Sequence, residues 1–173
     1  MAVTRYTIDG KGQIELNNVA FRRDGRIEAQ CALTADAENG MVLAIDKAHG
    51  TCAPSVDGKE VVCGINYSTE HLYDERKPGL KEFSLKKGEY PRIGLPAVGD
   101  LFTTNTIGFD TAVFANLEAV KTQLKSGVAY AGVDNGIWNL VKIKPTEGLT
   151  ARVVEVTTMP DGQDAVKLQI IAC

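Results

Sequence analysis

Residues 152–172 read RVVEVTTMPDGQDAVKLQIIA, two apolar segments joined by turn-forming residues. Apolar side chains alternate with polar ones in both segments: Val154, Val156, Val166, Leu168 and Ile170. A period of two is typical of half-buried β-strands, and Met159-Pro160-Asp161-Gly162 has the composition of a turn. We therefore expect the chain to end in a β-hairpin. Because a lone hairpin is only marginally stable in water, the rest of the protein must cover its apolar face.

The same pattern of short strands and glycine-containing turns recurs upstream, and it predicts a mainly β fold, either a compact β-barrel or a β-sandwich-like structure. Further strands are expected over Ile27–Leu33, Met41–Ile45, Val61–Ile65, Leu101–Asn105, Val128–Gly132 and Trp138–Ile143. Asp134-Asn135-Gly136 is a hairpin turn signal between the last two. Trp138 is the sole tryptophan, and we expect it to cover the apolar face of the sheet, with an interface anchor as the alternative.

One amphipathic helix is predicted over Phe114–Lys125. Its apolar residues recur at spacings of three and four: Phe114, Leu117, Val120 and Leu124. Asp110 and Thr111 offer N-caps, and Ser126-Gly127 has the form of a left-handed C-terminal cap. A helix with one apolar stripe is expected to lie over a sheet.

The chain divides into residues 1–25, a loosely held N-terminal arm, and residues 26–173, a β-rich domain that can be read as two sub-lobes, 26–90 and 91–173. The most charged part of the sequence, Tyr67–Lys87, is expected to be a solvated loop, with a partner-binding arm as the alternative.

Composition excludes several classes of partner. The 173 residues carry a formal net charge of −3 with a pI near 5.4, so we expect no broad nucleic-acid-binding face. No apolar run approaches the roughly 20 residues that span a bilayer, so no membrane partner is expected. Since the first ten residues are not a hydrophobic leader, a reducing cytosolic setting is expected. The four cysteines, Cys31, Cys52, Cys63 and Cys173, then act as small buried apolar residues.

Residues that carry chemistry are sparse, so we expect neither enzymatic activity nor a cofactor. The sequence contains no phosphate-binding glycine loop, no dinucleotide fingerprint and no nucleophile elbow. His49 and His71 are the only histidines, and each lies in a polar setting typical of a solvated imidazole. His49, Cys52 and Cys63 have the spacing of half a metal site without a fourth ligand, so a structural role for these residues is favoured.

A group of short motifs resembles one viral family. The segments are Asn39–Asp46, Gly50-Thr51, Asp57-Gly58 and Val62–Ile65. Together they are similar to the core pattern of tailed-phage head decoration proteins, the capsid cement proteins of the lambda type. The resemblance covers Ala37–Ser68, with weaker similarity over Val98–Asn105 and Gly132–Lys142. The charged loop Glu70–Lys87 and the helix Phe114–Lys125 depart from the family pattern.

The resemblance implies a compact, β-tulip-like fold and a virion protein on the capsid exterior, present in the bacterial host cytoplasm during assembly. Such a protein binds the major capsid protein, commonly as a homotrimer at three-fold positions, and stabilises the expanded shell. It also implies that the N-terminal arm adds a strand to capsid loops. The anchors in this chain would be Tyr6, Ile8, Ile14, Leu16 and Phe21. Deleting Met1 to Gly12 would then abolish attachment and leave the fold intact.

Three other interpretations stay open. The N-terminal residues are equally well explained as an ordinary edge strand of the core. A head-tail joining or tail protein has the same strand-rich sequence and would form rings in place of shell-bound trimers. A small β-barrel ligand-binding or enzymatic domain would require His49, His71 and the cysteines to converge in one cleft.

Overall fold

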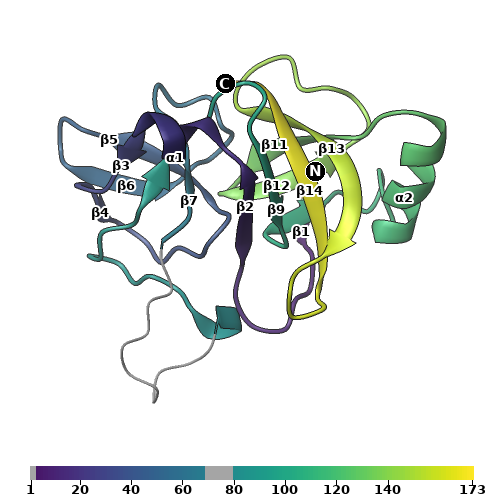
Figure 1. The fold of residues 1–173 in the computed structure, drawn as a ribbon, viewed down its shortest axis with the longest axis horizontal. Coiled ribbons are helices and arrows are strands. Elements are labelled where there is room, and N and C mark those ends of the chain that lie inside the picture. The colour runs from purple at the N-terminus through teal and green to yellow at the C-terminus, as the bar shows by residue number, and fades with distance from the viewer. Residues whose placement is uncertain (1–2, 69–79) are drawn as a thin grey trace.

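A computed structural model describes residues 3–68 and 80–173 of the chain. Strands make up 40% of the structure and helices 11%, so the fold is mainly β, as predicted. The strands form two mixed sheets that do not close into a barrel (Figure 1). Of the two architectures expected from the sequence, the structure is therefore compatible with the β-sandwich-like one.

The larger sheet has eight strands, and both of its outer strands come from the N-terminal segment. In spatial order the strands are β1 (Thr4–Arg5), β10 (Ile107–Phe109), β12 (Ile137–Val141), β11 (Tyr130–Asp134), β13 (Thr150–Thr158), β14 (Asp164–Ala172), β9 (Leu101–Thr104) and β2 (Ile14–Asn18). All neighbours are antiparallel except β10 and β12, which run parallel.

The smaller sheet has six strands from residues 27–94. In spatial order they are β3 (Ile27–Glu28), β8 (Ile93–Gly94), β7 (Cys63–Asn66), β5 (Val42–Asp46), β6 (Thr51–Pro54) and β4 (Ala32–Leu33). The expected single strand Ile27–Leu33 is wrong, because two short strands on opposite edges of this sheet replace it. β6, which the sequence reading missed, pairs with β5 on the side away from β7.

One core joins the two sheets. Val42 and Ile65 of the six-stranded sheet belong to the same buried cluster as Phe102, Trp138 and Leu168 of the eight-stranded sheet. The Trp138 ring lies 5.4 Å from that of Phe102, and its indole nitrogen donates a hydrogen bond of 3.1 Å to the Gly40 carbonyl. Trp138 is fully buried, so it is a core residue and the interface-anchor alternative is wrong. The division into two sub-lobes, residues 26–90 and 91–173, stays a prediction.

The C-terminal hairpin forms as predicted, with one change of register. β13 and β14 pair from Thr150 to Ala172, and Val166, Leu168 and Ile170 are buried. An irregularity between Val153 and Glu155 resets the alternation in β13, so Val153 is buried and Val154 is 43% exposed. A β-bulge of this kind adds one residue to a strand and turns the following side chains to the other face.

The second hairpin, β11–β12, also matches the prediction. Asp134 pairs with Ile137, which leaves a loop of two residues. Asn135 and Gly136 in this loop both have positive φ, at 47° and 80°. Two successive positive φ angles define the tight turn that suits the twist of paired strands and explain the Asn-Gly sequence.

The described part of the chain has two α-helices, one more than predicted. The predicted helix is α2 (Leu117–Ser126), which contacts β13. It begins three residues later than expected, because the Asn116 side chain caps it in place of Asp110 or Thr111. Gly127 has an extended φ of −172°, so the predicted left-handed C-terminal cap is wrong.

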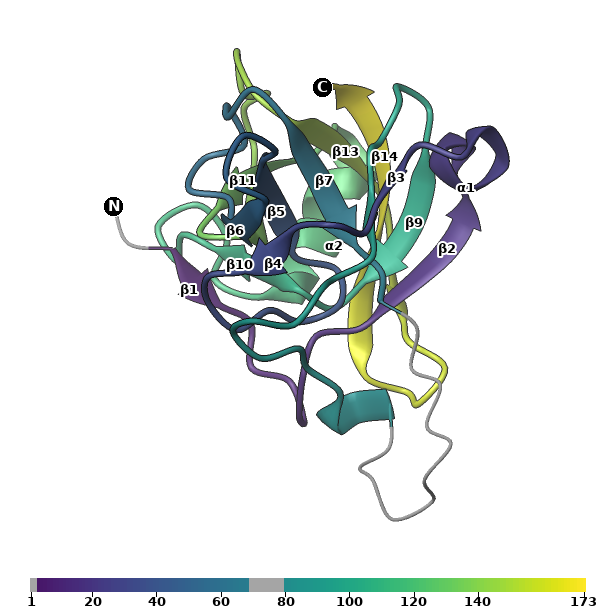
Figure 2. The ribbon, with the colours of Figure 1, turned by 90° about the vertical axis from the view of Figure 1, so that its left-hand side faces the viewer.

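The second helix, α1 (Ala20–Asp24), lies directly after β2 (Figure 2). It is a single turn that ends at Gly25, a residue with a φ of 67°. Phe21 is fully buried and attaches this turn to the core. The sequence does not predict this helix, because one turn is too short to show helical periodicity, and residues 20–24 therefore fall in the expected arm.

Part of the charged segment Tyr67–Lys87, residues 69–79, lies outside the described residues. The described part differs from the solvated loop that we expected. Tyr67 is 9% exposed and belongs to the main core, and Leu85 forms an antiparallel bridge with Ala37. The 3-10 turn η1 (Leu80–Glu82) precedes Leu85, and Lys81 pairs with Asp9 at 2.6 Å. Residues 80–87 therefore lie against the rest of the protein.

Candidate functional site

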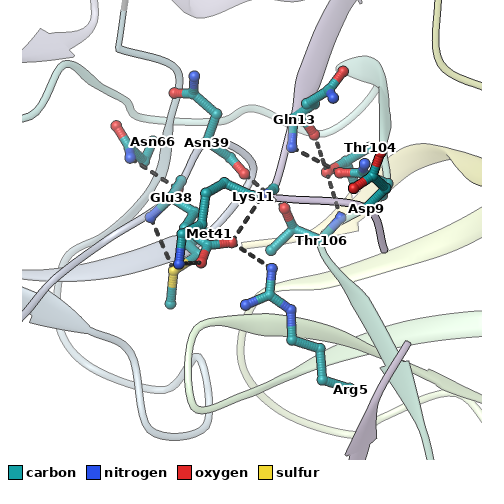
Figure 3. A network of polar contacts seen from close by, with 12 residues as sticks. Arg5, Asp9, Lys11, Gln13, Glu38, Asn39, Met41, Asn66, Thr104 and Thr106 are labelled. Atoms are coloured by element: carbon teal, nitrogen blue, oxygen red, sulfur yellow. Dashed lines mark hydrogen bonds and ion pairs between the residues drawn. The ribbon is translucent and has the colours of Figure 1, made fainter. Parts of the chain in front are cut away.

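The N-terminal segment is held in the fold by a carboxylate. Glu38 accepts hydrogen bonds from the Arg5 guanidinium and from the Gly12 amide, the latter at 2.7 Å. The Lys11 ammonium lies 3.6 Å from its other oxygen (Figure 3). The Glu38 side chain is only 12% exposed. Burial raises the pKa of this carboxyl, but the hydrogen bonds and the charges of Arg5 and Lys11 outweigh it, so the pKa is lowered overall.

A second set of polar contacts holds the residues just before β2. The Gln13 amide donates to the Asn105 side chain at 2.7 Å, and the Thr104 hydroxyl donates to the Gln13 carbonyl at 2.6 Å. The Thr106 hydroxyl donates to the carbonyl of Asn39 at 2.6 Å (Figure 3). All of these groups are buried, where a hydrogen bond is costly to lose. They fix the start of β2 against both β9 and the segment that leads to β5.

A cavity of about 440 Å³ borders β2, and we name it the β2 groove. Its lining residues come from both sheets and from α1: Ile14, Leu16, Arg22, Ile27, Asn39, Tyr67, Ser68 and Arg92. Ile14, Leu16 and Ile27 are partly buried and pack on the main core, so one side of the groove is apolar. The two arginines are exposed and carry its positive charge.

Phe21 and Tyr67 support the groove from the protein interior. Their ring centres are 5.1 Å apart, and the Tyr67 amide donates a hydrogen bond of 2.9 Å to the Arg92 carbonyl. Gly94 makes room for the Phe21 ring, because an alanine Cβ at that position would overlap ring atoms. The buried Phe21 fixes the position of α1, and Arg22 is the next residue along that turn.

Both arginines act on the Tyr67 phenol. The Arg92 guanidinium lies 5.8 Å from the centre of the Tyr67 ring. Burial raises the pKa of Tyr67 overall, while the positive charge of Arg92, whose side chain lies close to the phenol oxygen, and the charge of Arg22 act in the opposite direction. Within residues 3–68 and 80–173, the hydrogen of the buried Tyr67 hydroxyl has no acceptor. In the same ranges, neither arginine forms an ion pair with a carboxylate. This combination suits an anionic ligand group.

The five predicted anchor residues do not lie together. Ile14 and Leu16 line the β2 groove, and Phe21 packs beneath it. Tyr6 is elsewhere: its ring lies 6.2 Å from that of Phe109, and its hydroxyl donates to Asp164 at 2.7 Å, a bond that raises the pKa of Tyr6 to about 12. Ile8 is half-buried between β1 and β2.

The structure therefore places the N-terminal segment in the sheet as edge strands, which is the second of the two interpretations of its sequence. Residues 4–5 pair with β10, and residues 14–18 pair with β9. The loosely held arm is wrong for these residues. Contact with a partner through this segment stays a prediction.

The half metal site of the sequence does not assemble. His49 is exposed and contacts Asp46 at 2.6 Å, whereas Cys52 is buried in the smaller core cluster beside Cys31. Cys63 contacts Glu60, and burial together with this carboxylate raises the pKa of its thiol to about 12. Among the residues that the structure covers, no group of three metal-ligating side chains comes together. His71 lies outside the described residues.

The cysteines only partly follow the sequence expectation. Cys31 and Cys52 are buried, as predicted for small apolar residues, and Cys63 is half-buried. Cys173 is exposed, which contradicts the prediction. Its position one residue beyond the end of β14 explains the exposure.

A larger cavity of about 570 Å³ is a weaker candidate, because its charged groups already have partners. Cys63 and Cys173 are among its lining residues. Lys59 lies 3.3 Å from Glu147, and Glu60 accepts hydrogen bonds from Ser55 and the Val56 amide. A ligand there would compete with these contacts, whereas the arginines of the β2 groove have no carboxylate partner among the described residues.

Sequence reasoning missed Arg22, Tyr67 and Arg92. They are separated by up to 70 positions, and no local sequence pattern links them. Two pairings bring them together: β3 with β8, and β7 with β8. The only available signal was that Arg22 follows Phe21, an aromatic residue that the sequence analysis had already selected.

No helix among the described residues is long and apolar enough to cross a bilayer. Comparison with known proteins finds no matching family model, no matching curated protein and no matching solved structure.

Proposed function

We propose that this protein is a viral structural protein that binds the outer surface of an assembled phage capsid and stabilises its expanded form. The resemblance to decoration proteins over Ala37–Ser68 is one support. Its two longest motifs, Asn39–Asp46 and Val62–Ile65, pair directly as β5 and β7, with Val42 opposite Ile65. The two motifs therefore lie side by side in one sheet. Segments that matched the family only by chance would not need to be neighbours.

The open edge of the eight-stranded sheet at β2 is the observation that carries the proposal. Strand β2 pairs with β9 on one side, and no described strand covers the other. Its apolar residues Ile14 and Leu16 line the β2 groove. An uncovered strand edge beside an apolar groove is suited to binding an extended segment of another protein by strand addition.

Such binding stabilises a shell by linkage. A protein that attaches only to the expanded shell shifts the equilibrium toward that form, by about 2.7 kcal/mol per site when its free concentration is 100 times the Kd. The major capsid protein is the proposed partner, and bridging of neighbouring subunits follows if the protein is a homotrimer on the shell exterior. The geometry requires no chemical step.

Co-sedimentation with shells tests the proposal. Particles from a culture that carries the coding sequence supply unexpanded and expanded shells, and purified protein is mixed with each. We expect saturable binding to expanded shells, with weaker binding to unexpanded ones. Failure to bind either form would contradict the proposal. Binding confined to a head-tail ring or a tail would favour the other virion role.

A further inference from the structure

The β2 groove has the features of a site for a carboxylate carried by an extended peptide. From these features we infer that it binds an acidic side chain of the partner protein, with an apolar side chain of the same segment resting on Ile14 and Leu16. The identity of that partner as a capsid subunit rests on the proposed function.

Charge complementarity selects the acidic group. Arg22 and Arg92 both line the groove, and within residues 3–68 and 80–173 neither has a carboxylate partner. Lys47, Lys59, Lys81, Lys86 and Lys121 each lie within 4 Å of a carboxylate. Among the described residues Arg26 and Arg152 also form no ion pair, but they do not line this groove. Guanidinium groups bind carboxylates through paired hydrogen bonds, so two arginines in one cavity that have no carboxylate partner within the described residues favour a carboxylate ligand.

The Tyr67 hydroxyl is a second polar group at the same site. The Tyr67 residue is only 9% exposed, and the hydrogen of its hydroxyl has no acceptor among the described residues. A buried hydroxyl without a partner is unfavourable, and a carboxylate oxygen beside Arg92 would accept its hydrogen. Tyr67 therefore adds a neutral donor next to two cationic ones.

The peptide part of the inference follows from the strand edge. Side chains two residues apart in an extended segment lie on the same face, about 7 Å apart. A segment added along β2 would place one such side chain over Ile14 and Leu16 and the next toward the arginines. A free phosphate ion would use the cations but not the apolar side of the groove or the strand edge.

A short peptide tests this geometry directly. The probe is acetyl-Thr-Val-Thr-Glu-Thr-amide, in which valine and glutamate share a face. One control replaces glutamate by glutamine, and another, acetyl-Thr-Thr-Val-Glu-Thr-amide, puts valine and glutamate on opposite faces. Titration followed by NMR should shift the amide signals of residues 14–18 and the side-chain signals of Arg22 and Arg92, with binding about tenfold weaker for each control.

Variants of the protein give the matching test. Arg22→Gln with Arg92→Gln should weaken binding of the probe by more than tenfold and remove most of its salt dependence. The charge-matched control is Lys144→Gln with Arg152→Gln, which removes two exposed positive charges outside the groove and should leave binding unchanged. Arg22→Lys with Arg92→Lys keeps the charge and should retain part of the affinity, and thermal melts establish that each variant is folded.

Three results would overturn the inference: no shifts at millimolar probe, equal binding by the Arg22→Gln/Arg92→Gln variant, or binding of inorganic phosphate with no binding of the peptide. Failure of the proposed function is a separate outcome. If the wild-type protein binds the peptide but no shell, the proposed partner is wrong and the site stands. If the double glutamine variant binds shells as well as the wild type does, the site is wrong and the function stands.

Discussion

Glu38 is a largely buried side chain that holds the N-terminal segment against the rest of the protein. Its carboxylate receives Arg5, Lys11 and the Gly12 amide, all from that segment. At pH 7 the substitution Glu38→Gln should lower the free energy of unfolding by about 1–3 kcal/mol, because the charge-assisted hydrogen bonds are lost. Urea denaturation measures the change, with exposed Glu15→Gln on β2 as the control.

The pH dependence of this effect has a definite sign. The pKa of Glu38 is lower in the folded protein than in the unfolded chain, where it is about 4.3. Its contribution is therefore complete above the unfolded pKa and is lost as the pH falls through the folded pKa. The difference between wild type and Glu38→Gln should shrink in acid. A difference that stays constant from pH 7 to pH 3 would contradict the network in Figure 3.

Gly94 is the residue that lets Phe21 hold α1 beside the groove. A Cβ at Gly94 would overlap the Phe21 ring, so Gly94→Ala should lower the free energy of unfolding by about 1–3 kcal/mol. The smaller side chain in Phe21→Leu should reduce the additional cost of Gly94→Ala. A double-mutant cycle measured by urea denaturation tests this coupling, with Gly127→Ala as a control of little effect. Strict additivity would show that the two residues do not touch.

Single residues also show the limits of the sequence. The burial of Trp138 could be predicted from its apolar strand. The exposure of Val154 could not, because nothing in the alternating sequence of β13 indicates the β-bulge between Val153 and Glu155. No pattern in the sequence singles out Arg22 or Arg92. Their common cavity depends on long-range strand pairing, which local patterns do not encode.

At the scale of elements, the sequence predicted α2 correctly as a helix but placed its ends wrongly. The apolar spacing of Leu117, Val120 and Leu124 predicted the helix, whereas its first residue is set by Asn116, whose side chain accepts a hydrogen bond of 3.0 Å from the Ala119 amide. Asn116→Ala should destabilise the protein by about 1 kcal/mol, while Asn116→Asp should be nearly neutral. Thermal denaturation distinguishes the two variants. Equal stability of both would contradict the cap.

The N-terminal strands lead to a different expectation from that of a free arm. Removing residues 1–12 takes away β1 and the partners of Glu38, so we expect a loss of about 2–4 kcal/mol in the free energy of unfolding. The resemblance implied that this truncation leaves the fold intact, whereas the structure leads us to expect a less stable fold. Urea denaturation of the truncated chain, beside a control that lacks only residues 1–3, measures the loss. Unchanged stability would restore the arm interpretation.

Elements with local signals were predictable, and those without them were not. The hairpins β11–β12 and β13–β14 are joined by turn residues and alternate clearly, so both were found. Strands of two residues, such as β3 and β4, are too short to carry a period, and their single predicted strand was wrong. The parallel pairing of β10 with β12 joins segments far apart in sequence and has no local signature.

At the scale of the whole molecule, the two sheets share one core but keep open edges. The mainly β class followed from composition and turns, but the strand order did not, because it depends on which distant segments pair. The edge at β2 combines a strand side that no described strand covers, apolar side chains and two arginines. That combination suits attachment to another protein, and it is the basis of the proposed role on a capsid.

The most direct measurement is an electron cryomicroscopy map of the particles produced by a culture that carries the coding sequence. The account predicts density for the two sheets on the outside of the expanded shell, as trimers at three-fold positions, with the β2 edge facing a capsid subunit. Density at a head-tail ring or on a tail, or particles that lack the protein altogether, would contradict it.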